Sequence, residues 1–511
     1  MMDKIRSFAL SRRGFLGTAA AFAALPVRAE TPKKGGVLKM GLGGGESTNS
    51  LDPAVALSQV PYHVTRTFGE TLLDVNPDGT MDMRLAEAVE STPDAKSWIF
   101  RIRKGVEFHD GRTMTPQDVM DTMLRHSDAK SQSGALGLMT GIAGMKVDGD
   151  NFIVDLDTPN ADLPYLLSDY HLVIQPGGGR DNPGAGIGTG AYRVVEDQPG
   201  VRHAFEKFAN YWDDSRGHFE RVEISVINDG TARNSALQSG QVHVINNVAP
   251  KVARLLGRAP GVQVKNVSAR AHYVFIMRCD APPFDNRDLR MALKLAINRQ
   301  EMVDKILMGY GSRGNDMPVN AAYPLFDDTI PQRDYDPAQA AEYYRKSGHD
   351  GSPIVLHVSD TAFPSAVDAA QLFQQSAKAA GIPLEIVREP ADGYWTEVWN
   401  KKPFCASYWG GRAVQDQMYS TAYLSTADWN DTVFRNADFD QLVLKARGEL
   451  DPALRKADYR RIGEILRDEG GLICPMFNDY VEGISDKLMG WETNGVWELM
   501  NGLVPHKCWL A

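Results

Sequence analysis

Residues 406–416 collect side chains that could bind a charged solute. This stretch contains Tyr408 and Trp409 and, further on, Arg412 and Asp416. A guanidinium group holds a carboxylate or phosphate through two parallel hydrogen bonds, and aromatic rings supply apolar walls with polar tips. The same residues also have a structural interpretation, in which Arg412 pairs with Asp416 or another acid and the rings belong to a core. Residue types and spacing leave both interpretations open.

A second pattern would indicate an enzyme. Ser127 and Lys130 have the S-x-x-K spacing of a class of serine hydrolases, and Lys346-Ser347-Gly348 mimics the later basic motif of that class. The candidate for the middle motif, Ser47-Thr48-Asn49, precedes both instead of lying between them. The sequence contains neither H-E-x-x-H nor G-x-S-x-G. We therefore treat a serine hydrolase as the least favoured function and expect no enzyme.

Two glycine-rich segments begin like nucleotide-binding loops. The segment from Gly41 to Glu46 is followed by Leu51-Asp52-Pro53 rather than by a helix, and the segment from Gly186 to Ala191 leads into a strand pattern. A phosphate site of this type needs the N-terminus of a helix directly after the loop. The sequence therefore does not support nucleotide binding, and we expect no cofactor and no bound metal.

Periodicity predicts a mixed α/β chain. Residues 98–103 alternate apolar and basic side chains, as in a half-buried strand, and Thr115-Pro116-Gln117-Asp118 is a capping box that opens a helix. Further strands are predicted at 223–227, 242–245, 273–277, 354–358 and 384–387, and further helices at 289–296, after Asn298, after Asp336, at 365–380 and after Asp451. Residues 354–387 read as one βαβ unit with a right-handed crossover.

The first thirty residues predict an export signal. Arg6, Arg12 and Arg13 precede an apolar segment at 15–25 that is too short to span a bilayer, and small residues follow at 27–29. The run from Ser11 to Leu16 resembles the twin-arginine signal, which exports folded proteins. We expect a twin-arginine signal peptide over 1–29 and a mature chain in the periplasm.

Composition narrows the choice of partners. The chain has 511 residues, a net charge of −10 and 43% hydrophobic residues, which allows a large core in two to four domains. An acidic chain is a poor binder of nucleic acid, because long-range repulsion opposes contact. The cysteines lack zinc-type spacing and are compatible with one disulfide or with buried free thiols; they are Cys279, Cys405, Cys474 and Cys508.

A series of short motifs occurs in order along the chain. The most specific is the segment 100–112, followed by Asp118-Val119. The others are Asn49 to Pro53, Glu70 to Leu73, Leu85 to Glu87, Gly188 to Tyr192, Pro282 to Asp285, Arg290 to Leu293, Ala296 to Arg299 and Tyr335 to Ala340. In this order they resemble the dipeptide, oligopeptide and nickel-binding family of ABC-importer binding proteins, solute-binding family 5. The resemblance covers nearly the whole mature chain.

The resemblance implies a periplasmic binding protein-like α/β fold of type II, cluster C-like, with two lobes joined by a hinge and an extra small domain. Lobe I is expected at 30–74, 171–279 and 481–511, the small domain at 75–170 and lobe II at 280–480. It also implies that the 406–416 loop enters the cleft between the lobes. Related peptide binders place an Asp near the position of Arg412, so this chain departs from their pattern.

The resemblance implies a function and a set of ligand-binding residues. We expect the periplasmic substrate-binding component of an ABC importer, which captures an anionic or zwitterionic solute (a peptide or opine-like conjugate) by hinge closure and docks as a monomer on an inner-membrane permease. Arg412, Trp409, Tyr408, Asp416, Asn247 and Glu46 are the expected ligand contacts. A nickel-type metal-chelate binder and a ligand carrier for a chemoreceptor remain open alternatives.

Overall fold

The computed structural model describes residues 31–56, 58–128, 130–390, 394–427 and 429–511. The predicted signal peptide, residues 1–29, lies outside these ranges. Lys33–Ala511 form one compact unit. Every helix within the described ranges is too short or too polar to cross a bilayer.

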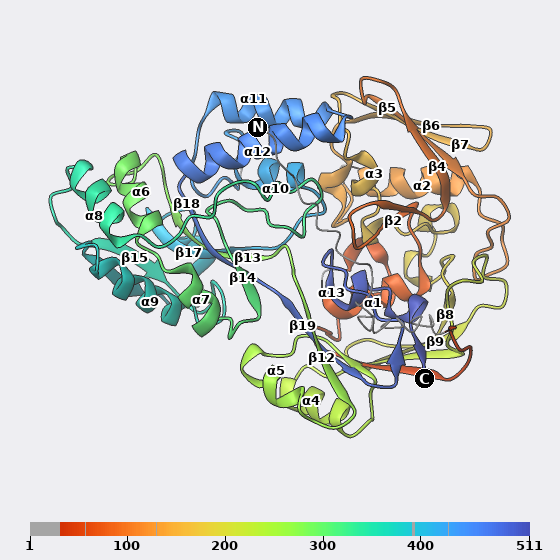
Figure 1. The fold of residues 1–511 in the computed structure, drawn as a ribbon. Coiled ribbons are helices and arrows are strands. Elements are labelled where there is room, and N and C mark those ends of the chain that lie inside the picture. The colour runs from red at the N-terminus through yellow and green to blue at the C-terminus, as the bar shows by residue number, and fades with distance from the viewer. Residues whose placement is uncertain (1–30, 57, 129, 391–393, 428) are drawn as a thin grey trace, which may run out of the picture. The chain divides into compact units, whose positions relative to one another are not determined.

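A seven-stranded sheet gathers strands from distant parts of the chain (Figure 1). Its order is β12-β19-β11-β1-β10-β9-β8, and β1 runs parallel to both β10 and β11. The strands are β1 (Val37–Leu42), β8 (Tyr192–Gln198), β9 (Arg202–Lys207), β10 (Arg221–Val226), β11 (Val244–Ile245), β12 (Val262–Val267) and β19 (Tyr480–Ser485). The helices α1 (Gln59–Phe68), α4 (Gly230–Gln238) and α5 (Pro250–Leu256) pack beside it.

A six-stranded sheet forms the second large layer, in the order β14-β18-β13-β17-β15-β16. Its strands are β13 (His272–Met277), β14 (Gly311–Arg313), β15 (Ile354–Val358), β16 (Leu384–Arg388), β17 (Phe404–Trp409) and β18 (Leu472–Asn478). The predicted βαβ unit is present, because β15 and β16 pair in parallel and α9 (Ala366–Lys378) connects them. Phe373 of α9 is fully buried in the core with Phe275 and Phe404.

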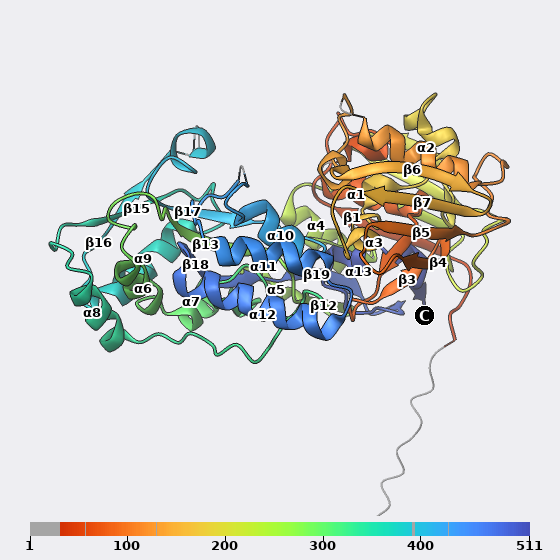
Figure 2. The same cartoon turned by 90° about the horizontal axis from the view of Figure 1, so that it is seen from above.

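Helices surround the six-stranded sheet on both sides. They are α6 (Arg287–Leu295), α7 (Arg299–Lys305), α8 (Pro337–Lys346), α10 (Gln415–Ala422), α11 (Ala437–Gly448) and α12 (Pro452–Glu469). Figure 1 and Figure 2 both show α11 and α12 side by side. Side chains of Asn298, Asp336 and Asp451 accept hydrogen bonds from the first-turn amides of α7, α8 and α12, as the sequence predicted.

A four-stranded antiparallel sheet, in the order β4-β5-β7-β6, packs against α2 (Pro116–Ser127). Its strands are β4 (Ala86–Ser91), β5 (Ser97–Ile102), β6 (Ile142–Asp148) and β7 (Asn151–Leu156), and a hairpin of β2 (Leu73–Val75) and β3 (Met81–Met83) leads into it. The capping box is confirmed, because the Thr115 hydroxyl accepts from the amide of Asp118 and the Asp118 carboxylate accepts from the amide of Thr115.

Two chain crossings join the seven-stranded and six-stranded sheets. Residues 268–271 link β12 to β13, and Asp479 links β18 to β19. After β19 the chain returns to α1 through β20 (Leu488–Met489), α13 (Glu498–Asn501), α14 (Val504–Lys507) and β21 (Trp509–Leu510), and Tyr62 of α1 donates a hydrogen bond to Asn501. Residues near the crossings therefore contact both sheets.

The cysteines are free thiols, so the disulfide that the sequence allowed is not formed among them. Cys405, Cys474 and Cys508 are buried, and Cys279 is partly buried. Burial raises the pKa of Cys279, which keeps its thiol protonated and unreactive.

Candidate functional site

A cavity of about 360 Å³ lies where the loop after β17 meets α1, α3 (Leu163–Leu166) and the C-terminal segment. Its volume falls within the range typical of small-molecule sites. The side chains that can contact a solute there are Tyr62, Arg66, Tyr165, Asp169, Tyr170, Arg412, Gln417, Trp497 and Asn501. They come from segments more than 400 residues apart in sequence, so the fold alone creates this site.

Arg412 lies on the wall of this cavity and has no acidic partner among the residues that the structure describes. Its Nη1 donates to the carbonyl oxygens of Gly410 and Gly411, each at 3.2 Å. The ion pairs among the described residues include none with Arg412. Burial lowers the pKa of Arg412, an effect that Tyr323 and Tyr408 partly oppose. A half-buried guanidinium that keeps its charge in this setting favours a carboxylate or phosphate on the solute.

Tyr323 and Arg270 hold the backbone of the loop that carries Arg412. The hydroxyl of Tyr323 accepts a hydrogen bond from the amide of Arg412 at 3.1 Å. Arg270, which is 2% exposed and lies in the first crossing, donates to the carbonyl oxygens of Arg412 at 3.2 Å and Ala413 at 2.8 Å. Its guanidinium carbon lies 5.1 Å from the centre of the Tyr323 ring. This arrangement fixes the loop before a ligand arrives, which reduces the entropic cost of binding.

Gly411 permits the close approach of this loop to the crossing. A Cβ atom at position 411 would lie 2.6 Å from the Cβ of Arg270. No other residue type fits that distance without moving one of the two segments. Gly411, Arg270 and Tyr323 therefore act together to hold the loop that carries Arg412.

The opposite wall of the cavity is aromatic and carries one carboxylate. The Tyr62 ring lies 4.7 Å from the Tyr170 ring and 5.4 Å from the Trp497 ring. Asp169 accepts hydrogen bonds from Nδ1 of His171 at 2.6 Å and from its amide at 3.0 Å. Its side chain remains 27% exposed. A solute with an ammonium group and a carboxylate would meet an acid on this wall and a guanidinium on the other.

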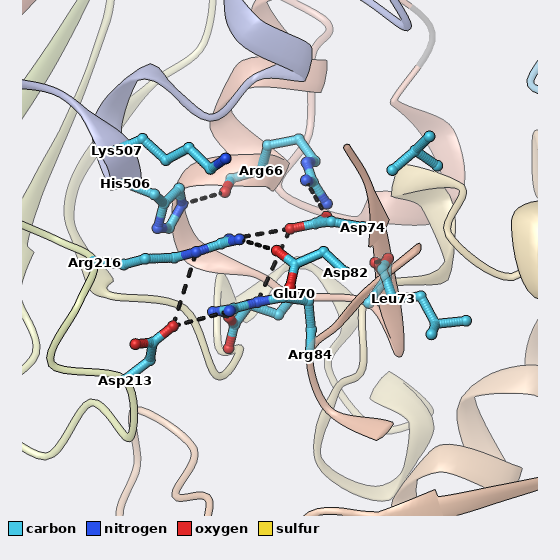
Figure 3. A network of polar contacts seen from close by, with 12 residues as sticks. Arg66, Glu70, Leu73, Asp74, Asp82, Arg84, Asp213, Arg216, His506 and Lys507 are labelled. Carbon is cyan, nitrogen blue, oxygen red and sulfur yellow. Dashed lines mark hydrogen bonds and ion pairs between the residues drawn. The ribbon is translucent and has the colours of Figure 1, made fainter. Parts of the chain in front are cut away.

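Arg66, which lines the cavity, belongs to a buried network of ion pairs around Asp74 (Figure 3). The guanidinium groups of Arg66 and Arg216 both reach the carboxylate of Asp74, at 2.5 and 3.1 Å. Arg84 pairs with Glu70 at 2.9 Å and with Asp213 at 2.8 Å. Burial alone would raise the pKa of Asp74, but the positive charges of the neighbouring arginines outweigh burial and hold this pKa well below its usual range. Arg66 therefore reaches the cavity with its charge already neutralised.

The structure places one of the six predicted contacts, Arg412, on the cavity. Tyr408 is 50% exposed and does not line it. Trp409, which we expected in the cleft, is 4% exposed and packs in the core beside Trp429, with its indole N–H donating to Asp431 at 3.2 Å. Because side chains alternate along β17, Trp409 points into the core and Tyr408 points away from it.

The remaining three predicted contacts also lie off the cavity. Asp416 is buried and pairs with Arg447 at 3.0 Å, so it does not neutralise Arg412. Asn247 and Glu46 are exposed, the former in a left-handed turn with φ of 50°. Asn247 follows β11 and Glu46 follows β1, and neither loop contributes to the cavity. Residues of α1 and of the C-terminal segment line it instead.

Sequence reasoning missed the aromatic wall and Asp169. Tyr62, Tyr170 and Trp497 carry no motif, and each belongs to a different segment. The density of aromatic and glycine residues at 490–502 was an available signal. Within the described ranges, no group of three metal-ligating side chains is present.

Two large sheets, each covered by helices and joined by two chain crossings, are the fold of a substrate-binding protein. Residues 80–431 match the family described as Bacterial extracellular solute-binding proteins, family 5 Middle. The chain belongs to this family, and the resemblance seen in the sequence is confirmed.

Relatives extend the match to almost the full length. The chain is 25% identical over 496 residues to the glutathione-binding protein GsiB of Salmonella choleraesuis (strain SC-B67), covering 93% of this chain and 94% of that protein. Two solved structures share the fold. The periplasmic binding protein DppA from Helicobacter pylori, in complex with the peptide STSA, gives a TM-score of 0.75 at 20% identity over 94% of this chain and 98% of that chain. The PBP AgaA from A.tumefacien R10, in complex with agropinic acid, gives 0.74 at 21% identity over 93% and 99%.

Proposed function

We propose that this chain is the periplasmic substrate-binding component of an ABC importer and that it captures a small anionic or zwitterionic solute. The observation that carries the proposal is Arg412, a partly buried cation on the cavity whose charge no described acid neutralises. A carboxylate on the solute would supply the missing partner. Asp169 on the other wall would receive an ammonium group of the same solute.

Relatives support this class of ligand. The curated relatives are named for glutathione, and a structural neighbour was solved with agropinic acid. Both named ligands carry carboxylate groups. For this chain, an acidic peptide or an opine-like conjugate is therefore the first class to test.

The proposed mechanism is capture between two lobes. The seven-stranded sheet would be the centre of lobe I, the six-stranded sheet that of lobe II and the four-stranded sheet that of the small domain. Closure about the two crossings would exclude water and so strengthen the hydrogen bonds between charged groups. A membrane permease would then receive the solute from the monomeric binding protein, which performs no chemistry itself.

A thermal-shift screen of the mature chain, residues 30–511, tests the proposal. The panel contains glutathione, opine-like conjugates, neutral sugars, uncharged peptides and nickel–histidine complexes, each also tested with Arg412→Ala. A ligand at about 100 times its dissociation constant adds about 2.7 kcal/mol of stability. A shift with acidic compounds that is lost in Arg412→Ala supports the proposal. A shift only with neutral sugars or nickel–histidine complexes, equal in both proteins, contradicts it.

A further inference from the structure

A second cavity, of about 450 Å³, lies next to the one that Arg412 borders. Tyr165 lines both cavities. Ala413 faces the first and its neighbour Val414 faces the second. The hydroxyl of Tyr165 donates to the carbonyl of Gly79 at 2.8 Å, which anchors the ring between them. The two cavities are therefore neighbours that share the side chain of Tyr165.

The wall of the second cavity is mainly apolar. The side chains that form it come from the β2–β3 hairpin, the four-stranded sheet and the helical region of the other large unit; they include Met81, Met83, Val89, Trp98, Leu325 and Leu450. A cavity of about 150 Å³ lined by such groups suffices for benzene. This cavity has room for a larger ring or a branched hydrocarbon chain.

Three polar side chains of this cavity, Asp162, Arg455 and Gln415, already interact with other groups of the protein. Asp162 forms an ion pair with Arg455, and Arg455 donates to the hydroxyl of Tyr459 at 3.0 Å. Gln415 donates to the carbonyl of Pro324 at 2.8 Å. A polar solute would thus gain few hydrogen bonds here, whereas an apolar group would release water from apolar surface.

We propose that the second cavity binds an apolar group of the same solute whose anionic group lies at Arg412. The inference rests on the proposed function, since the anionic end is the solute group proposed there. It narrows the ligand to an anion joined to an aromatic or branched aliphatic group. A fully polar acid would fill the first compartment alone and bind more weakly.

Two fluorescent probes test the inference with the mature chain. Anilinonaphthalene sulfonate carries an anionic group on an apolar ring system, and phenylnaphthylamine has the same rings without the sulfonate. Both emit more strongly in apolar surroundings. We expect saturable binding of both to the wild type, and tighter binding of the sulfonate.

Variants separate the two compartments. Leu450→Trp fills the second cavity from a position that is 38% exposed, so folding is preserved, and Val89→Phe fills it from the opposite wall. Each variant should lower the affinity for both probes by roughly tenfold, because the ring system of the probe loses its apolar site. Arg412→Ala should weaken only the sulfonate, again by roughly tenfold. Leu454→Trp is the matched control, since Leu454 is 56% exposed and does not line the cavity.

The outcomes distinguish this inference from the proposed function. If the wild type gives no saturable signal with either probe, or if both filling variants bind like the wild type, the apolar compartment is refuted. If the filling variants weaken both probes but Arg412→Ala leaves the sulfonate unaffected, the compartment stands and the anionic site at Arg412 fails.

Discussion

Two groups of buried or partly buried arginines, each with one member that lines the first cavity, differ in their partners. Arg66, Arg84 and Arg216 are buried and share the carboxylates of Glu70, Asp74, Asp82 and Asp213 (Figure 3). Arg412 and Arg270 are also largely removed from water, yet their guanidinium groups bond only to backbone carbonyl oxygens among the described residues. The first group has acidic partners within the protein. In the second group, Arg412 lines the cavity and forms no ion pair with any described acid, so its positive charge is available to a ligand.

This difference separates structural from ligand-binding charge. A buried ion pair that loses one partner leaves an uncompensated charge, so its members cannot be removed without loss of stability. A cation that has no acidic partner carries a desolvation cost in the free protein, which a bound anion would repay. Substitutions in the ion-pair network around Asp74 should therefore lower the free energy of unfolding, whereas substitution of Arg412 should lower ligand affinity.

Removing the shared acid should have the largest effect. In Asp74→Asn, Arg66 and Arg216 lose a common carboxylate, and we expect a loss of about 3–5 kcal/mol in the free energy of unfolding near neutral pH. Because the folded-state pKa of Asp74 is lowered, its contribution is present above the unfolded pKa and is lost as pH falls below it. Urea unfolding at several pH values measures this difference.

The matched control for this substitution is Asp148→Asn, at an exposed position at the end of β6. It should change stability by less than about 0.5 kcal/mol. Equal stability of the two variants would show that the network around Asp74 is not structural.

A buried acid without a cation provides the converse case. Glu482 of β19 is 1% exposed, accepts a hydrogen bond from the amide of Leu499, and has no ion pair among the described residues. Burial raises the pKa of Glu482 to about 8. Between the unfolded value of 4.5 and about 8 the folded protein holds a proton that the unfolded chain releases, so stability falls as pH rises through this window.

Glu482→Gln should remove this pH dependence. The amide oxygen can still accept the Leu499 hydrogen bond. We expect the variant to exceed the wild type by up to roughly 5 kcal/mol near the upper end of the window, since each pKa unit corresponds to about 1.4 kcal/mol. The difference should vanish at the acidic end, where Glu482 is protonated in both states. Thermal unfolding across the window tests this, and a constant offset at every pH would contradict it.

The cleft arginine should affect binding rather than stability. Arg412→Ala is expected to weaken the binding of an anionic ligand by about 1.5–3 kcal/mol, the range for a hydrogen bond to a charged group. Stability without ligand should change by less than about 0.5 kcal/mol, because no acid loses its partner. Arg412→Lys keeps the charge but loses the planar fork, so an intermediate affinity is expected. Calorimetric titration and urea unfolding give the two values.

Arg193→Ala, at an exposed position on β8, is the control for unspecific loss of positive charge. If it weakens the ligand as much as Arg412→Ala does, the effect is long-range attraction and Arg412 is not a contact.

The smallest expected effect concerns the support behind Arg412. Tyr323→Phe removes the hydroxyl that accepts the Arg412 amide, and should cost about 0.5–1.5 kcal/mol in ligand affinity. Hydrogen exchange of the amides at 411–414 should accelerate. Tyr419→Phe is the matched control, because the buried hydroxyl of Tyr419 has no hydrogen-bond partner within the described part of the chain. Similar exchange in both variants would refute a positioning role for Tyr323.

Much of the fold was predictable because it depends on local signals. The capping residues Thr115, Asn298 and Asp451 lie at the helix starts that the sequence predicted, and β15, α9 and β16 follow the predicted order. Capping depends on hydrogen bonds within one turn, and amphipathic periodicity depends on one face of one element. Neither requires knowledge of the distant chain.

The site was predictable only in part. Arg412 was found because its loop follows a strand in a recognisable family pattern, but Trp409 was misplaced because the sequence does not fix which face of β17 is buried. Asp416 was a plausible partner for Arg412 on spacing alone. Instead α11 brings Arg447 to Asp416, which takes it away from Arg412.

The sequence by itself determined the family, the mixed α/β class and the position of most helices and strands, since these follow from motifs and periodicity within short segments. The export signal over residues 1–29 stays a prediction. The tertiary structure decided which charges are neutralised and which are not. That outcome depends on contacts between residues hundreds of positions apart, such as Tyr62 with Asn501 and Arg270 with Ala413. Charge compensation is a property of distance in space, so the sequence could name Arg412 but could not show that none of the described acids pairs with it.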